Sequence, residues 1–215
     1  MSETATGLIL RTRPLTETSL IVHWLTPRFG RIATVAKGAR RNKSQFLGKL
    51  DLFYEADFSF SRSRSSDLHT LREVSLRHTH GELRADILKL HRAAYATAFI
   101  EQATETDTPL PGAFELLRDF LKCLCEQKSA AQLVFALELK WLREIGLQPD
   151  WTQTRLAAGT KKIAEGLTQK DWTAGLRLKL TDAQVVELRQ FLHGFLIFHL
   201  GRLPKGRASA LADRI

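Results

Sequence analysis

RIATVAKGARRNKSQFLGKL, residues 31–50, is the segment that best predicts the fold of this chain. Its first residues alternate, with Ile32, Thr34 and Ala36 on one face, as expected for a half-buried β-strand that Gly38 ends. The residues after Gly38 carry four cations, and no acidic residue precedes Asp51: Arg40, Arg41, Lys43 and Lys49. Such a cluster attracts a polyanion, most often a nucleic acid backbone. A solvated basic loop would give the same pattern.

The positive charge is concentrated in the N-terminal third. The chain of 215 residues has a formal net charge of +9. Residues 1–80 hold 13 Lys and Arg against 7 Asp and Glu, a net of +6, and the remaining residues hold 19 against 16, a net of +3. This imbalance predicts an anionic partner for the N-terminal part, without separating DNA, RNA and lipid headgroups.

The sequence favours a cytoplasmic location. The two cysteines, Cys123 and Cys125, are too few for a disulfide framework. The first residues, MSETATGLIL, lack the basic and apolar regions of a signal peptide. No uninterrupted apolar run approaches the roughly 20 residues that a membrane span needs. We therefore expect no membrane segment, and association with the nucleoid if the partner is DNA.

The first 80 residues show the patterns of five short strands. Alternating or apolar runs predict strands at residues 6–15, 19–25, 31–37, 52–60 and 68–76. A longer connection separates the third strand from the fourth. This arrangement favours a five-stranded oligonucleotide-binding (OB) type barrel, and an SH3-like barrel is the alternative.

From residue 81 onward the apolar residues recur at helical spacing. Helices are predicted over residues 81–106, 114–127, 129–145 and 181–201. Ser129 with Gln132, and Thr181 with Gln184, have the spacing of capping boxes. Residues 147–180 are poorly periodic and are predicted to be a loop-rich insert. The fold class is therefore α+β, with a barrel domain at residues 1–80 and an α-helical bundle at residues 81–215.

No catalytic or metal-binding motif is visible. The chain lacks a phosphate-binding Gly-rich loop, a nucleophile elbow and paired carboxylates that would hold Mg²⁺. Cys123 and Cys125 would lie about 200° apart around a helix. His78 and His80 have no further ligands nearby in the sequence. We therefore expect no enzyme activity, no metal and no cofactor.

A nucleic-acid interface would use the cations of the barrel and exposed aromatic rings. The candidate phosphate ligands are Arg11, Arg13, Arg31, Lys37, Arg40, Arg41, Lys43, Lys49, Arg62 and Arg64. Of the candidate stacking residues Trp24, Phe29, Phe46 and Tyr54, Phe29 and Phe46 are preferred because both flank turns. Packing in the barrel core is the alternative for each ring. No base-reading motif is present, so binding is expected to be independent of sequence and weakened by salt.

The tail offers a second basic patch. Arg202, Lys205 and Arg207 follow the last predicted helix and could bind a partner or more DNA. A solvated C-terminal tail is the alternative reading.

Several of these segments together resemble a known family. Residues 7–44 resemble the N-terminus of the bacterial recombination-repair RecO family, most clearly in RPLTETS at residues 13–19, the Gly30-Arg31 turn and VAKGAR at residues 35–40. Thr70-Leu71-Arg72 is similar to its fifth strand. The segments at Leu137-Glu138 to Gly146 and at Leu200-Gly201 to Arg207 look like its central helix and its C-terminal end.

The resemblance implies a fold and a function. Its members have an OB-fold followed by an α-helical bundle and are not enzymes in the bond-breaking sense. They bind single- and double-stranded DNA, anneal complementary strands and contact the acidic C-terminal tail of single-stranded-DNA-binding protein (SSB). With a RecR-type partner they help a RecA-type recombinase load onto covered DNA.

Two segments depart from the family pattern. Many members carry a four-cysteine zinc module where residues 147–180 lie, and this segment has no cysteine, which predicts no zinc. The SSB-tail pocket of the best-known members uses basic residues where this chain reads QLVFA, residues 132–136. Tail binding would therefore need other cations, such as Lys122, Lys140 or Arg143.

Three other functions fit the same residues. An OB-type barrel also serves RNA-binding modules, since the fold does not distinguish the sugars. A nuclease with a site assembled from distant residues would show no motif. A scaffold whose basic face binds acidic protein tails would bind peptides and no DNA.

Overall fold

The computed structural model describes residues 2–127 and 131–212. The chain divides into two compact units. Residues 1–81 and 100–118 form one, which we call the barrel unit, and residues 82–99 and 119–215 form the other, which we call the helical unit. A domain boundary near residue 80 remains our proposal, with the addition that residues 100–118 belong to the barrel unit.

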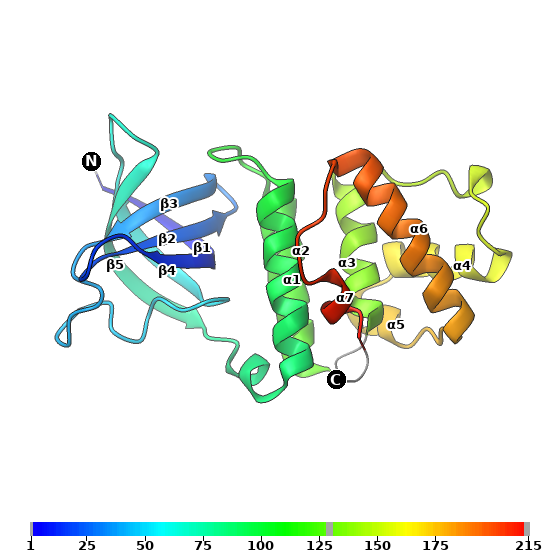
Figure 1. The fold of residues 1–215 in the computed structure, drawn as a ribbon. Helices are drawn as coiled ribbons and strands as arrows, with labels where there is room; N and C mark the ends of the chain where they lie inside the picture. The colour runs from blue at the N-terminus through cyan, green and yellow to red at the C-terminus, as the bar shows by residue number, and fades with distance from the viewer. Residues whose placement is uncertain (1, 128–130, 213–215) are drawn as a thin grey trace. The chain divides into compact units, whose positions relative to one another are not determined.

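The barrel unit contains five strands that close into a barrel, which confirms the OB-type fold. These are β1 (Ser2–Pro14), β2 (Leu20–Thr26), β3 (Gly30–Ala36), β4 (Glu55–Ser61) and β5 (Leu68–His78), drawn in blue to cyan in Figure 1. Around the barrel they follow the order β1-β2-β3-β5-β4. β3 and β5 are parallel, and every other neighbouring pair is antiparallel.

The alternation predicted for β3 is confirmed. Ile32, Thr34 and Ala36 point into the barrel core, and the residues between them are half-exposed. The buried Thr34 hydroxyl accepts a hydrogen bond of 2.9 Å from the indole Nε1 of Trp24. Trp24 in turn stacks on Phe58, with ring centroids 4.1 Å apart. The polar group in the core is therefore satisfied, as buried polar groups must be.

The fourth strand begins later than predicted, at Glu55 instead of residue 52. Phe53 has a positive φ of 69°, and the amide of Tyr54 donates to the carbonyl of Asp51 in a tight turn. Leu52 and Tyr54 therefore lie outside the strand. The apolar alternation that suggested a strand here comes from a turn whose Phe53 side chain is buried.

Residues 101–108 of the barrel unit lie against the start of β3. The amide of Asp107 donates to the carbonyl of Arg31 at 2.9 Å, and Arg31 forms an isolated β-bridge with Thr106. A Cβ on Gly30 would overlap the backbone carbonyl of Thr108, and Gly30 has a φ of +65°. Only glycine fits this approach without strain.

The rest of the described chain is helical, in the order that the sequence predicts. The elements are η1 (Gly81–Ala85), α1 (Ile87–Ala103), α2 (Pro111–Glu126), α3 (Ala131–Glu144), η2 (Trp151–Gln153), α4 (Ala158–Gln169), α5 (Trp172–Leu176), α6 (Asp182–Leu200) and α7 (Arg207–Ala210). Among the described residues, none of these helices is both long and apolar enough to cross a membrane.

The two predicted capping boxes have different outcomes. The Thr181 hydroxyl accepts from the amide of Gln184, whose side chain accepts in return from the amide of Thr181, which confirms the box at the start of α6. Gly201 ends α6 with a positive φ of 74°, also as predicted. The box predicted at Ser129 lies outside the described residues.

Residues 147–180 are more helical than the predicted loop-rich insert. They hold η2, α4 and α5, and α4 alone covers 12 residues. The buried stripe of α4 is formed by Thr160, Ala164, Leu167 and Thr168. Two of these four are threonines, so the stripe reads as polar in the sequence although its spacing is helical.

Candidate nucleic-acid interface

Residues 37–49, which we call the cationic loop, are fixed to the barrel by apolar anchors. Ala39 and Phe46 are 8% and 4% exposed and belong to the barrel core. The amide of Arg40 donates to the carbonyl of Thr18 at 3.0 Å, and the Gln45 side chain donates to the carbonyl of Arg72 at 2.9 Å. The loop is therefore held on two sides in a defined conformation.

The charged side chains of the cationic loop face solvent. Lys37, Arg40, Arg41 and Lys43 are all exposed, and Lys49 is half-buried. Within the described part of the chain, none of these five lies within 4.0 Å of an acidic side chain oxygen. Arg40 donates to the carbonyl of Thr16 at 3.3 Å, which leaves its charge uncompensated. These positive charges can therefore attract an anionic ligand.

Two arginines of β1 extend this surface along the outside of the sheet. Strand register pairs Arg13 with Ile21 of β2 and Arg11 with His23 of β2. Arg13 is exposed and lies near the same end of the strands as the cationic loop. Arg11 is also exposed, but its guanidinium pairs with Glu101 at 2.9 Å.

The positive field on this face is visible in the protonation of His23. Burial, and to a smaller extent repulsion from Arg11, Arg13 and Arg31, together lower the pKa of His23 to about 4. The imidazole is therefore neutral at physiological pH and adds no charge to the surface.

Arg31 is a weaker candidate phosphate ligand than the exposed cations, because its guanidinium is already engaged by the backbone. Its Nε and Nη2 atoms both donate to the carbonyl of Thr104, at 3.1 and 2.7 Å. The side chain is half-buried, and burial lowers its pKa. The arginine satisfies the backbone after α1 and so has a structural role.

The cations at 62 and 64 lie at the other end of β3 from the cationic loop. Phe29 lies in the turn just before β3. The guanidinium carbon of Arg62 lies 5.4 Å from the centroid of the Phe29 ring. β3 has seven residues and spans about 20 Å from Gly30 to Ala36, so Phe29 and Lys37 lie at opposite ends of the strand. The ten predicted cations therefore do not form one continuous rim.

The Phe29 end of the barrel is more nearly neutral than the loop end. Arg62 forms an ion pair of 2.9 Å with Glu3, and that hydrogen bond raises the pKa of Arg62 and lowers that of Glu3. Arg28, which sequence analysis missed, lies 5.0 Å from the Phe29 centroid. A base stacking on Phe29 would compete with two guanidinium groups. Arg64 is exposed in the loop after β4.

Two of the four candidate stacking rings are in the core. Phe46 is 4% exposed and Trp24 is fully buried, so the proposed stacking role of Phe46 is wrong. Its position beside a turn reflects its function as an anchor of the cationic loop. Tyr54 is half-buried and packs against the core at the edge of a small pocket.

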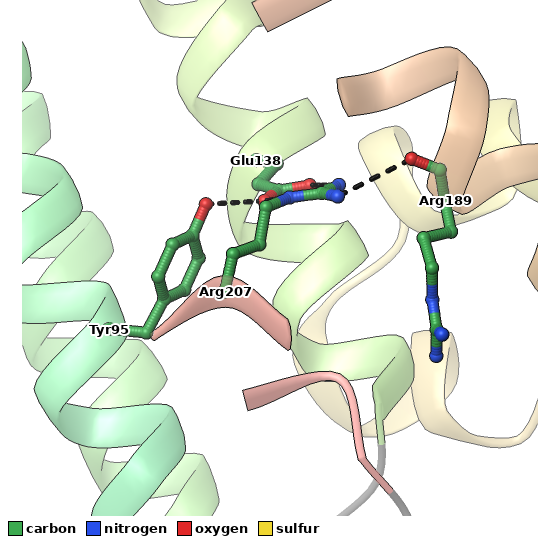
Figure 2. Close-up of polar contacts among 4 residues, drawn as sticks. All are labelled: Tyr95, Glu138, Arg189 and Arg207. Carbon is green, nitrogen blue, oxygen red and sulfur yellow. Dashed lines mark hydrogen bonds and ion pairs between the residues drawn. The ribbon is translucent and has the colours of Figure 1, made fainter. Parts of the chain in front are cut away.

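One of the three cations of the predicted basic tail, Arg207, is a structural element of the helical unit. Arg207 is 8% exposed and donates from Nε and Nη2 to the two carboxylate oxygens of Glu138, each at 2.7 Å. Figure 2 shows this pair together with Tyr95, whose hydroxyl donates to Glu138 at 2.6 Å, and with the carbonyl of Arg189. Arg207 therefore cannot serve as a surface cation, which corrects the prediction.

The other candidates in the helical unit differ in availability. Lys140 donates to the carbonyls of Thr168 and Lys170, at 3.2 and 2.6 Å, and lies over the ring of Trp172. Burial lowers its pKa. Four candidates are exposed: Lys122, Arg143, Arg202 and Lys205.

No candidate metal centre emerges from the described residues, where no three His, Cys, Asp or Glu side chains gather. The Nδ1 atom of buried His80 lies 2.7 Å from the carbonyl of Phe53, and its ring stacks on His78. This pair therefore stabilises the end of β5.

The chain combines an OB-type barrel with helices, and the barrel carries an exposed cationic loop. These features define the class: a protein with a basic, OB-type N-terminal domain. Two family models cover most of the chain: Recombination protein O N terminal matches residues 1–80, and Recombination protein O C terminal matches residues 84–155. The chain belongs to the RecO family.

Curated relatives carry the same family name. "DNA repair protein RecO" of Bacillus pumilus (strain SAFR-032) is 32% identical over 147 residues, which cover 68% of this chain and 57% of the relative. The protein of that name in Bacillus subtilis (strain 168) is 31% identical over 144 residues, 67% of this chain and 56% of the relative. The protein of that name in Listeria monocytogenes serotype 4a (strain HCC23) is 27% identical over 205 residues, which cover 94% of this chain and 80% of the relative. The chain thus spans less than two thirds of the first relatives it matches.

Proposed function

We propose that this chain is a DNA repair and recombination protein that binds the phosphate backbone of DNA through the cationic loop, without reading bases and without breaking bonds. The observation that carries the proposal is the exposed set Lys37, Arg40, Arg41 and Lys43 on a loop anchored by Ala39 and Phe46. The relatives' name, DNA repair protein RecO, supports the choice of DNA as the anion.

The geometry gives strand annealing a simple physical basis. Two complementary single strands repel each other through their phosphates. A fixed group of cations that neutralises phosphates on both strands lowers the cost of their encounter, and it releases condensed counterions. No catalytic group is required, so we infer that the protein acts by binding alone.

The family membership extends the proposal to protein partners. We infer that the chain acts with a RecR-type partner, helps a RecA-type recombinase load onto SSB-covered DNA and works in the cytoplasm at the nucleoid. For the acidic SSB tail, Lys122 and Arg143 are the better candidates, because Lys140 already binds two carbonyls.

Neutralising the cationic loop tests the proposal. The triple variant Arg40→Gln, Arg41→Gln, Lys43→Gln should bind single-stranded DNA on the order of tenfold more weakly, and the slope of log affinity against log salt should fall by about 2. Fluorescence anisotropy over a salt series measures both quantities. The matched control is Arg155→Gln, Lys162→Gln, Lys179→Gln, which removes three exposed charges from the helical unit and should leave the slope nearly unchanged.

Equal losses in the two triple variants would contradict the proposal, because net charge alone would then explain binding. The same titration with a matched RNA strand tests the RNA-binding alternative, which predicts tighter binding to RNA. Product analysis after incubation with Mg²⁺ or Mn²⁺ tests the nuclease alternative. An acidic peptide that binds while DNA does not would favour the scaffold.

A further inference from the structure

A small apolar pocket opens directly beside the cationic loop. Its volume is about 280 Å³. The pocket is lined by apolar side chains and one carboxylate: Leu20, Phe46, Leu47, Leu50, Tyr54 and Asp51. This volume lies just below the range of about 300–1,000 Å³ that is typical of small-molecule sites, so the pocket suits one flat ring system.

The pocket presents unusual apolar surface to solvent. Leu47 is 65% exposed although it directly follows the buried Phe46. Leu20, Leu50 and Tyr54 pack against the barrel core with one side and are partly accessible on the other. A leucine this exposed contributes little burial to the isolated fold, whereas it would gain apolar contact if a ligand covered it.

Cations flank the pocket along the chain. Arg40 follows the lining residue Ala39, and Lys49 lies between the lining residues Gly48 and Leu50. The acidic member of the lining, Asp51, accepts a hydrogen bond of 2.8 Å from the amide of Leu52. An occupant should therefore combine an apolar ring with negative charge on the side of Arg40 and Lys49.

We propose that this pocket receives one unpaired nucleobase from a DNA strand whose phosphates lie on the cationic loop. A nucleotide is a ligand that joins a flat ring to a phosphate. Bases in a duplex are stacked and paired, so only a single strand can turn a base outward without paying for unpairing. The inference rests on the proposed function and adds to it a preference for single strands.

Shortening the pocket wall tests the inference. The variant Leu47→Ser removes apolar contact at an exposed position and should leave the fold intact. Its affinity for a single strand should fall on the order of fivefold, with no matching loss for the duplex of the same sequence. The control Val186→Ser changes a side chain on α6 that is 51% exposed and should alter neither affinity.

A second readout follows the base itself. A single strand that carries one 2-aminopurine should change fluorescence on binding as its base leaves its stacked neighbours and meets Tyr54. In the variant Tyr54→Leu, which keeps the wall apolar, that change should be reduced while the phosphate contacts persist. Far-ultraviolet circular dichroism confirms that each variant is folded.

The outcomes separate this inference from the proposed function. If Leu47→Ser weakens single-strand and duplex binding equally, or weakens neither, the base pocket is ruled out while phosphate binding by the cationic loop stands. An unchanged 2-aminopurine signal in Tyr54→Leu would also count against the pocket. If the wild-type chain binds neither form of DNA, both the inference and the proposed function are overturned.

Discussion

Glu138 places a carboxylate in the middle of α3, where its neighbours Leu137 and Leu139 are fully buried. A buried charge is costly unless it is paired and hydrogen-bonded. Glu138 is paired with Arg207, which is 69 residues away in the sequence, and with the hydroxyl of Tyr95 (Figure 2). The network thereby fixes the segment after α6 onto the helical unit.

Breaking this buried pair should be strongly destabilising. Arg207→Leu would leave the Glu138 carboxylate buried with only the Tyr95 hydroxyl as a partner. We expect a loss of about 3–5 kcal/mol in the free energy of unfolding. Urea unfolding followed by circular dichroism measures it.

The matched control is an ion pair at the surface. Arg77 pairs with Asp57 at 2.7 Å, and both side chains are about half exposed, at 53% and 46%. Arg77→Leu should cost much less than Arg207→Leu, because solvent screens an exposed ion pair. Similar losses in the two variants would show that the Glu138 network is not a principal source of stability.

His23 makes the stability of the barrel depend on pH. Its folded pKa of about 4 lies below the ordinary value of 6.5, because the ring is half-buried and faces Arg11, Arg13 and Arg31. Between those two pH values the unfolded chain binds more protons, so the free energy of unfolding falls as the pH is lowered from 6.5 to 4. Solvent screening of the half-exposed ring reduces the effect to about 1–2 kcal/mol.

Replacing the imidazole should remove that loss. Urea midpoints at pH 7 and pH 4.5 should differ less in His23→Gln than in the wild-type chain. Carboxylates titrate equally in both proteins, so the comparison isolates His23. An identical pH dependence in the two proteins would contradict a depressed pKa at this position.

At the scale of elements, patterns that depend on local spacing are readable from the sequence. The alternation of β3 and the Thr181 capping box are confirmed because each is decided within a few residues. α4 was missed because two of its buried residues are threonines. Their hydroxyls are satisfied, Thr160 by Glu187 and Thr168 by the carbonyl of Ala164.

The candidate site was predictable only in part, for a similar reason. A sequence shows that Lys37, Arg40, Arg41 and Lys43 are close together, and the structure leaves them exposed. It does not show that Arg31 meets the carbonyl of Thr104, 73 residues later. The position of Phe46 beside a turn also does not show that its side chain points inward and anchors the cationic loop.

The turn before β3 allows a matched test of how closely the backbone at residues 104–108 approaches Gly30. Gly30 and Gly48 have similar positive φ values, +65° and +73°. A Cβ on Gly30 would overlap the backbone of Thr108, whereas a Cβ on Gly48 would meet no atom within 4 Å. Gly48→Ala should cost about 1–2 kcal/mol from the left-handed conformation alone. Gly30→Ala should cost clearly more, because the segment at residues 104–108 must also move.

Thermal or urea unfolding of the two variants measures the difference. Equal losses would mean that residues 104–108 are not held against the turn, and that Arg31 is free to leave the carbonyl of Thr104. In that case Arg31 would be as good a candidate phosphate ligand as the exposed cations.

At the scale of the whole molecule, charge is distributed by unit and by end of the barrel. Residues 1–80 carry a net charge of +6, yet Arg62 and Arg77 are paired with acidic groups. Among the described residues of the barrel, the largest group of cations without an ion pair is the cationic loop together with Arg13, whereas Arg28, Arg64 and Arg72 are spread over the rest of the barrel. This uneven distribution favours a single strong phosphate-binding region over a uniformly basic barrel.

The most direct test of the central claim locates the DNA on the protein. Hydrogen exchange with mass spectrometry, with and without a single-stranded oligonucleotide, reports where amides become protected. We predict slower exchange in peptides that cover residues 37–50, with little change in α3 and α6. Protection confined to the helical unit, or exchange at residues 37–50 that DNA leaves unchanged, would contradict the claim that the cationic loop holds the phosphates.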